Sequence, residues 1–117
     1  MRLNEISYND ASPIDGYGPG FFRVGRHVLR GACLVTPWNA GPWGGLGDWD
    51  APLSLQGKID VLIVGTGAEI AHLPADFRAA FEGVGIGVEA MNSPAAARTY
   101  NVLLGEGRRI AVCLLPV

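Results

Sequence analysis

The chain has 117 residues, of which 49% are hydrophobic and 17% are charged, and its formal net charge is −2. A chain of this length and composition forms one domain with an apolar core, which excludes an intrinsically disordered protein. Nucleic-acid-binding proteins carry a basic excess that neutralises phosphates, so this slightly acidic chain is not expected to bind DNA or RNA.

The first part of the chain is dominated by residues that favour turns. Residues 1–20 contain several glycines and prolines, together with an Asn-Asp pair. This composition predicts a turn-rich lead-in with one short strand at residues 5–8.

A β-hairpin is predicted directly after the lead-in. Residues 21–24 and 27–29 alternate in polarity around the Gly-containing pair at 25–26, which is typical of a two-residue hairpin turn. The second strand is expected to continue to Thr36, with a bulge at Gly31.

Residues 37–50 hold all three tryptophans of the chain, Trp38, Trp43 and Trp49. Glycines and prolines between them prevent a long regular element, so we expect a loop with aromatic anchors. The tryptophans either fold back as a lid over the core or form an exposed surface. Such a surface would bind a protein partner or a second copy of this chain.

The second half of the chain predicts a β-α-β-α-β unit. Its expected elements are a strand at 59–64, a helix at 74–82, a strand at 86–91, a helix at 95–104 and a strand at 109–115. Ser93 is expected to be the N-cap of the second helix, with Pro94 at the first helical position. The first two strands should be parallel neighbours in one mixed sheet, and helices should cover at least one face of that sheet.

Gly65-Thr66-Gly67 follows the first of these strands, at the position of phosphate-binding turns in α/β proteins. It is not a dinucleotide-binding fingerprint, because Ile70 occupies the position of the third glycine, and it lacks the Gly-Lys-Ser/Thr of a P-loop. The turn either holds a ligand or a partner's polar group, or it is a sharp turn whose glycines allow positive φ or close packing.

Asn92, Ser93 and the start of the second helix form another candidate site. Unpaired N–H groups and the helix dipole favour a negative charge there, and Arg98 could lean back toward the same edge. Because parallel strands end at one edge of a sheet, Thr66 and Ser93 would flank one crevice. The structural alternative is that Ser93 only caps the helix, while Arg98 pairs with Glu89 or with solvent.

Catalytic and metal-binding patterns are missing from the sequence. His27 and His72 lack the spacing of metal ligands, and no Ser/His/Asp or Cys/His arrangement can be assembled. Cys33 and Cys113 lie in apolar runs and are expected to be buried, reduced thiols. We therefore expect no catalytic residue, no metal and no cofactor. Asn101 lies in the middle of a helix and is expected to hydrogen-bond a neighbouring loop.

Targeting and membrane signals are also missing from this sequence. It has no run of about 18 apolar residues that would predict a membrane-spanning helix. The polar residues 1–5 lack the apolar core of a signal peptide. A cytoplasmic protein is therefore expected.

Three blocks of sequence are informative in combination: residues 60–67, 85–93 and 97–103. Together they resemble a family of small α/β proteins of unknown function that includes an assembly factor for mitochondrial respiratory complex I (NADH:ubiquinone oxidoreductase). The resemblance covers most of the chain. It departs at Asp60, where family members often have Glu, and at residues 92–93, where they often have Asp-Thr.

The resemblance, which runs from about residue 20 to residue 116, implies a three-layer α/β domain with a mixed central sheet. From the length of the chain we expect a single domain over residues 1–117. We expect a bacterial protein. For the mitochondrial member of the family, the resemblance implies a scaffold that binds other assembly proteins. It supplies no catalytic residues. Our leading hypothesis is a non-enzymatic binding or assembly protein with protein partners. The alternative is a protein, or an enzyme, that binds a small molecule or anion at the sheet edge.

Overall fold

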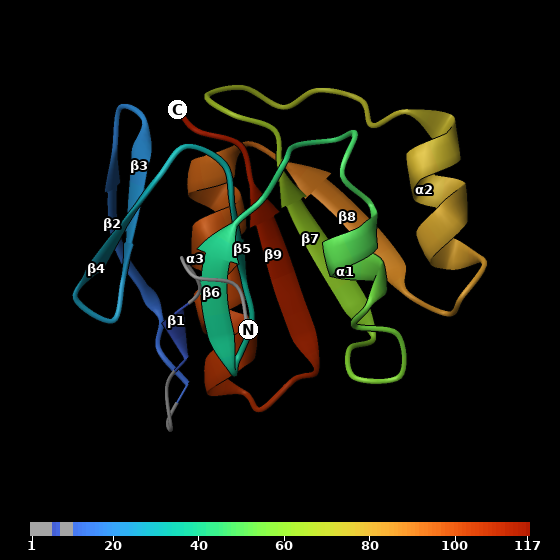
Figure 1. Ribbon diagram of the computed structural model, residues 1–117, viewed down its shortest axis with the longest axis horizontal. Helices are drawn as coiled ribbons and strands as arrows, with labels where there is room; N and C mark the ends of the chain where they lie inside the picture. Colours follow the sequence, from blue (N-terminus) through green and yellow to red (C-terminus); the bar gives the residue numbers. More distant parts are fainter. Residues whose placement is uncertain (1–5, 8–10) are drawn as a thin grey trace.

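The computed structural model describes residues 6–7 and 11–117 (Figure 1). Its strands are β1 (Ile6–Ser7), β2 (Ile14–Gly18), β3 (Phe21–Val24), β4 (His27–Arg30), β5 (Cys33–Val35), β6 (Asn39–Pro42), β7 (Val61–Gly65), β8 (Gly87–Met91) and β9 (Ile110–Leu114). Its helices are α1 (Asp50–Leu53), α2 (Ala75–Glu82) and α3 (Ser93–Gly105). The strands form a six-stranded sheet in the order β1-β6-β5-β9-β7-β8 and a three-stranded sheet in the order β2-β3-β4.

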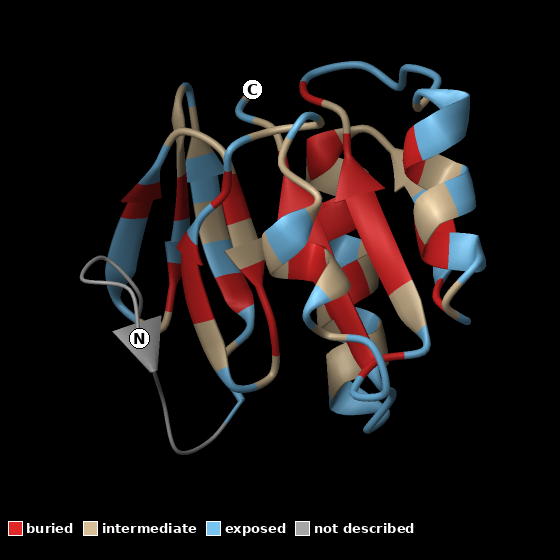
Figure 2. Cartoon of the chain, turned by 45° about the vertical axis from the view of Figure 1, so that its right-hand side comes forward, coloured by how far each residue is buried: buried red, intermediate tan, exposed pale blue. Residues whose placement is uncertain are grey.

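The six-stranded sheet is mixed, as the sequence predicts. β7 runs parallel to β8 and β9, whereas β5 runs antiparallel to β6 and β9. The apolar run of β7 is explained by its central position, because a strand between two neighbours and two covering layers is buried on both faces. Figure 2 shows this concentration of buried residues in β7 and β9.

Two hydrophobic cores lie on opposite faces of the six-stranded sheet. Ile63 and Val112 belong to the core that contains α3 and the three-stranded sheet. Their chain neighbours Leu62 and Cys113 belong to the core that contains α2 and Trp43. This alternation follows from the period of two in a β-strand. It confirms the three-layer α/β fold with its mixed central sheet.

The N-terminal part of the chain differs from the prediction in three places. The hairpin of β3 and β4 is confirmed, but residues 14–18 of the expected turn-rich lead-in form β2, which pairs with β3. Glycines in β2 conceal the alternation on which a strand prediction depends. The long strand expected up to Thr36 is wrong, because Gly31 adopts a φ of 77° and the chain passes there from one sheet to the other.

The expected loop at residues 37–50 is also wrong in part. Asn39–Pro42 forms β6, which pairs with β5, and Asp50 begins α1. The short strand expected at residues 5–8 is confirmed for Ile6–Ser7, while its ends lie outside the described residues. Among the residues that the structure describes, no helix combines the length and the apolar character needed to span a bilayer.

Candidate functional site

Gly65 and Gly67 pack directly against Ser93 at the start of α3. The Ser93 Oγ accepts a hydrogen bond from the Gly67 N–H at 2.9 Å and donates one to the Leu115 carbonyl oxygen at 2.6 Å. The Ser93 N–H donates to the Gly67 carbonyl oxygen at 2.7 Å. We refer to Gly65, Gly67, Ser93 and Leu115 as the junction. It ties the end of β7 to the start of α3 and to the end of β9.

The junction has no room for a side chain at Gly65. A Cβ placed there would lie 2.7 Å from the Ser93 Oγ and 2.8 Å from the Ser93 Cα. Gly67 has a φ of 102°, which L-residues with side chains rarely adopt. The close-packing and positive-φ alternatives for these glycines are therefore both realised.

Thr66 organises the segment that follows β7, which we call loop 66–74. Its hydroxyl lies 2.8 Å from the Glu69 carbonyl oxygen and accepts a hydrogen bond from the Ala71 N–H at 3.0 Å. Its own N–H donates to the Met91 carbonyl oxygen at 2.9 Å, which continues the pairing of β7 with β8. Thr66 therefore fixes the path of the loop as it leaves the sheet.

The N–H groups at the start of α3 have partners within the chain. Asn92, and not Ser93 as predicted, is the N-cap: its side chain accepts from the Ala95 N–H at 2.8 Å, and its carbonyl accepts from the Ala96 N–H at 2.9 Å. The prediction failed because Ser93 is fully buried and its hydroxyl is used by the junction. Pro94 has no N–H to offer. The donors expected to hold an anion are thus already satisfied.

Arg98 lies on α3, and its side chain is exposed.

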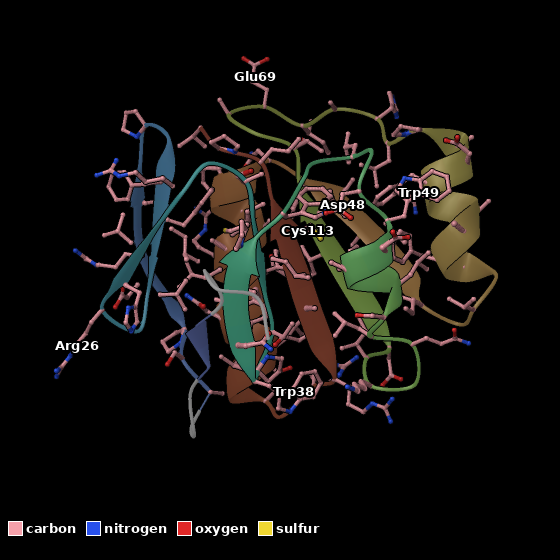
Figure 3. The ribbon with its side chains drawn as sticks, in the orientation of Figure 1. Arg26, Trp38, Asp48, Trp49, Glu69 and Cys113 are labelled. Carbon is pink, nitrogen blue, oxygen red and sulfur yellow. The ribbon has the colours of Figure 1, made fainter. Side chains whose placement is uncertain are left out.

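The three tryptophans lie in different environments. Trp43 is only 4% exposed, and its Nε1–H donates to the Asp48 carbonyl oxygen. Trp49 is half-buried and packs edge-on against Phe77 with 6.1 Å between ring centroids. Trp43 and Trp49 therefore pack over the core, as in the first of the two alternatives for this segment. Trp38 is 46% exposed and lies apart from Trp49 in Figure 3.

A crevice of about 400 Å³ lies between loop 66–74, α2 and β8. We call it the β8 crevice, and its lining residues are Ile70, Ala71, His72, Leu73, Arg78, Val88, Glu89 and Ala90. Sequence reasoning did not identify it, because loop 66–74 mixes apolar and polar residues and the sequence does not show which of them are exposed. In the structure Ile70 is 67% exposed.

The β8 crevice follows an outer strand of the six-stranded sheet. The Gly87 N–H bonds to the Asp60 carbonyl, and the Met91 carbonyl accepts from Thr66, so alternate residues of β8 face β7. Val88 and Ala90 therefore direct their N–H and C=O groups outward. Arg78 of α2 donates from Nη1 to the Val88 carbonyl oxygen at 2.8 Å. The crevice thus combines apolar side chains with the polar side chains of His72, Arg78 and Glu89. The outward backbone groups of Ala90 lie beside them.

The cysteines are confirmed as free, buried thiols on opposite faces of the sheet. Desolvation by burial raises the pKa of Cys33 to about 12. Burial also raises the pKa of Cys113 well above 9.0, and its neighbours Cys33 and Asp48 add to this.

Among the residues that the structure describes, no three His, Cys, Asp or Glu side chains are grouped so that they could hold a metal ion. Asn101 hydrogen-bonds the backbone of Ile14. The expected bond to another segment is present, but its partner lies in strand β2 and not in a loop.

Comparisons with known proteins agree with this fold. A family model described as "Protein of unknown function (DUF498/DUF598)" matches residues 14–115. An uncharacterized protein of Rhodobacter capsulatus is 47% identical over 100% of this chain and 94% of its own length. The NADH dehydrogenase (ubiquinone) 1 alpha subcomplex assembly factor 3 of Danio rerio is 33% identical over 88% of this chain, which spans 63% of that protein.

Solved structures of similar proteins superpose over nearly the whole chain. A crystal structure titled as an outer membrane protein from Bartonella henselae is 34% identical, with a TM-score of 0.85 over 94% of this chain and 98% of that one. A solution structure from Bordetella pertussis, titled as a Mth938-like domain, is 27% identical, with a TM-score of 0.77 over 99% and 92% of the two chains. The three-layer fold is therefore shared with proteins from Bartonella henselae and Bordetella pertussis.

Proposed function

We propose that this chain, which belongs to the DUF498/DUF598 family of proteins of unknown function, binds other proteins and promotes their assembly. One observation carries the proposal: the chain is 33% identical, over 88% of its length, to a protein named as an assembly factor for NADH dehydrogenase. Since the chain spans 63% of that protein, the part they share would supply the binding domain. A role without catalysis also agrees with the expectation from the sequence.

We place the partner-binding surface at the β8 crevice and loop 66–74. Ile70 is 67% exposed there, and exposed apolar side chains beside polar groups are common anchors at protein interfaces. The outward backbone groups of Ala90 add hydrogen-bonding capacity at the same place. Gly65, Thr66, Gly67, Asn92 and Ser93 would serve this surface indirectly, because they fix the loop and the start of α3.

Arg98 and Trp38 are the remaining exposed members of the residues predicted for binding. Arg98 lies on α3, the helix whose start packs against Gly67, so the surface would extend onto this helix if Arg98 takes part. Trp38 lies in the turn between β5 and β6 and would form a separate contact. Testing them individually shows how far the surface reaches.

Affinity capture from the source organism tests the proposal. The tagged wild-type chain would be compared with Ile70→Glu, Arg98→Ala and Trp38→Ala. Val102→Glu is the matched control, because Val102 is 60% exposed on α3 and does not line the crevice. We expect the wild type and the control to capture the same subunits or assembly proteins of a multisubunit complex, and Ile70→Glu to lose most of them.

Two outcomes would contradict different parts of the proposal. If the wild-type chain enriches no protein over an untagged extract, the binding function is wrong. If Ile70→Glu captures the same proteins as the wild type, the function stands and its placement at the β8 crevice is wrong.

A further inference from the structure

Among residues 6–7 and 11–117, no strand pairs with the outer edge of β4 in the three-stranded sheet. In the opposite outer strand, β2, Asn101 accepts from the Ile14 N–H and donates to the Ile14 carbonyl, each at 2.8 Å. β4 pairs with β3 through Val24 opposite His27, and the Gly31 N–H donates to the Gly20 carbonyl. Paired backbone groups alternate in an antiparallel ladder, so the N–H and C=O groups of Val28 and Arg30 point away from β3.

This edge is basic, although the whole chain has a net charge of −2. Residues 20–31 contain three arginines and no carboxylate. All three arginines are exposed, and Arg23 forms an ion pair with Asp15 of β2 at 3.0 Å. Figure 3 shows Arg26 pointing away from the body of the molecule at the end of the hairpin.

Val28 adds an apolar contact between the arginines. It is 51% exposed, while its neighbour Leu29 is buried in the core. A strand added beside β4 would therefore find outward backbone groups, one apolar side chain and two positive charges within a few residues. Strand addition to an exposed sheet edge is an established mode of peptide recognition, in which alternate side chains set the specificity.

The charges discriminate between occupants of this edge. A second copy that paired its own β4 antiparallel to this one would bring the arginines of the two chains together. Like charges opposite each other destabilise a strand pair. An acidic segment would instead place carboxylates beside Arg26 and Arg30.

We propose that the β4 edge binds an extended, acidic segment of another protein, which adds as a fourth strand to the sheet β2-β3-β4. The partner backbone pairs with Val28 and Arg30, and its carboxylates pair with Arg26 and Arg30. The argument uses none of the residues of the β8 crevice, so the two surfaces are independent.

Amide NMR titration of the full chain with two synthetic peptides tests this proposal. One peptide alternates Glu and Val over seven residues, and its matched control alternates Lys and Val. We expect the acidic peptide to shift the Val28 and Arg30 amide signals and to slow their hydrogen exchange. The lysine peptide should leave them unchanged, and 0.5 M salt should weaken binding of the acidic peptide at least fivefold.

Two variants separate strand addition from nonspecific charge attraction. Val28→Pro removes an N–H that has no role in the β3–β4 ladder, and proline is tolerated at such edge positions, so the fold should be retained. Val28→Thr retains the N–H and is its matched control. We expect Val28→Pro to weaken binding at least tenfold, Val28→Thr to bind nearly as well as the wild type, and Arg26→Gln/Arg30→Gln to weaken binding at least fivefold.

Several results would overturn the proposal. These are equal binding of the two peptides, no shift at Val28 or Arg30, and shifts confined to Val88 and Ala90 of the β8 crevice. Unchanged binding by Val28→Pro, with the circular dichroism spectrum of the wild type, would also overturn it. Dimerisation of the wild type that Val28→Pro abolishes would show that a second copy occupies the edge instead.

Discussion

The junction and the β8 crevice are both built around loop 66–74, yet they use their residues in opposite ways. The junction contains two glycines and a serine, and Asn92 lies next to it; these are the residue types of anion-binding turns. The structure turns their polar groups inward, so that Ser93 bonds to Gly67 and Leu115. The crevice is lined by ordinary loop, helix and strand residues, of which Ile70, Ala71, His72 and Glu89 are exposed. The glycines and the serine that follow these strands therefore form a tightly packed connection in this protein. The accessible surface is the neighbouring β8 crevice.

The largest expected effect is that of a methyl group added within the junction. A Cβ at Gly65 would lie 2.8 Å from the Ser93 Cα, a backbone atom that cannot rotate away. Gly65→Ala should lower the free energy of unfolding by about 3 kcal/mol, measured by urea denaturation. Gly105→Ala is the matched control, because nothing lies within 4 Å of its Cβ position, and it should leave stability unchanged or raise it slightly. Equal stability of the two variants would show that the junction is loosely packed.

The next effect comes from removing the hydroxyl at the centre of the junction. Ser93→Ala leaves the buried Gly67 N–H without its acceptor and the Leu115 carbonyl without its donor. We expect a loss of about 2 kcal/mol and faster hydrogen exchange at the Gly67 amide. Ser54→Ala removes an exposed hydroxyl that donates to the Ala51 carbonyl three residues earlier, and it should change stability by less than about 0.5 kcal/mol. If Ser93→Ala is no more damaging than this control, the hydroxyl is dispensable.

A smaller effect is expected on how the free energy of unfolding depends on pH, through the buried thiol of Cys33. The pKa of Cys33 rises from 9.0 to about 12 on folding, because burial disfavours the thiolate. Its contribution to stability is therefore complete below pH 9 and is lost as the pH rises toward 12. At pH 10 the loss should be about 1.4 kcal/mol relative to pH 8. The free energy of unfolding would be measured by urea denaturation at pH 8 and at pH 10 for the wild type and for Cys33→Ala. Between these pH values it should fall by about 1.4 kcal/mol less in Cys33→Ala than in the wild type. An equal drop in both proteins would mean that Cys33 ionises as readily when folded.

The C-terminal half could be predicted from the sequence because each of its elements carries a local signal. β7 is a continuous apolar run, and the helices begin beside Pro74 and Pro94. The N-terminal half lacks such signals. Glycines conceal the alternation in β2, and the change of sheet at Gly31 depends on pairing with distant strands.

From the sequence we could predict where in the fold the candidate site residues lie, but not what their side chains contact. The sequence correctly brings Thr66 and Ser93 to neighbouring positions, since the strands that precede them are parallel. It does not reveal whether a hydroxyl faces solvent or another backbone. The Ser93 hydroxyl is buried because Gly67 and Leu115 approach it from two different strand ends, and this contact joins segments more than twenty residues apart.

The smallest effect on stability should come from the exposed wall of the β8 crevice. Ile70 is 67% exposed, so Ile70→Glu removes little buried area and should change the free energy of unfolding by less than about 0.5 kcal/mol. Urea denaturation checks this, with the exposed α3 variant Val102→Glu as the reference. The same substitution should nonetheless reduce partner capture, which Gly65→Ala would affect only through loss of folded protein. A destabilisation above about 1 kcal/mol would assign Ile70 to packing of the loop, and the crevice would then resemble the junction in being part of the scaffold.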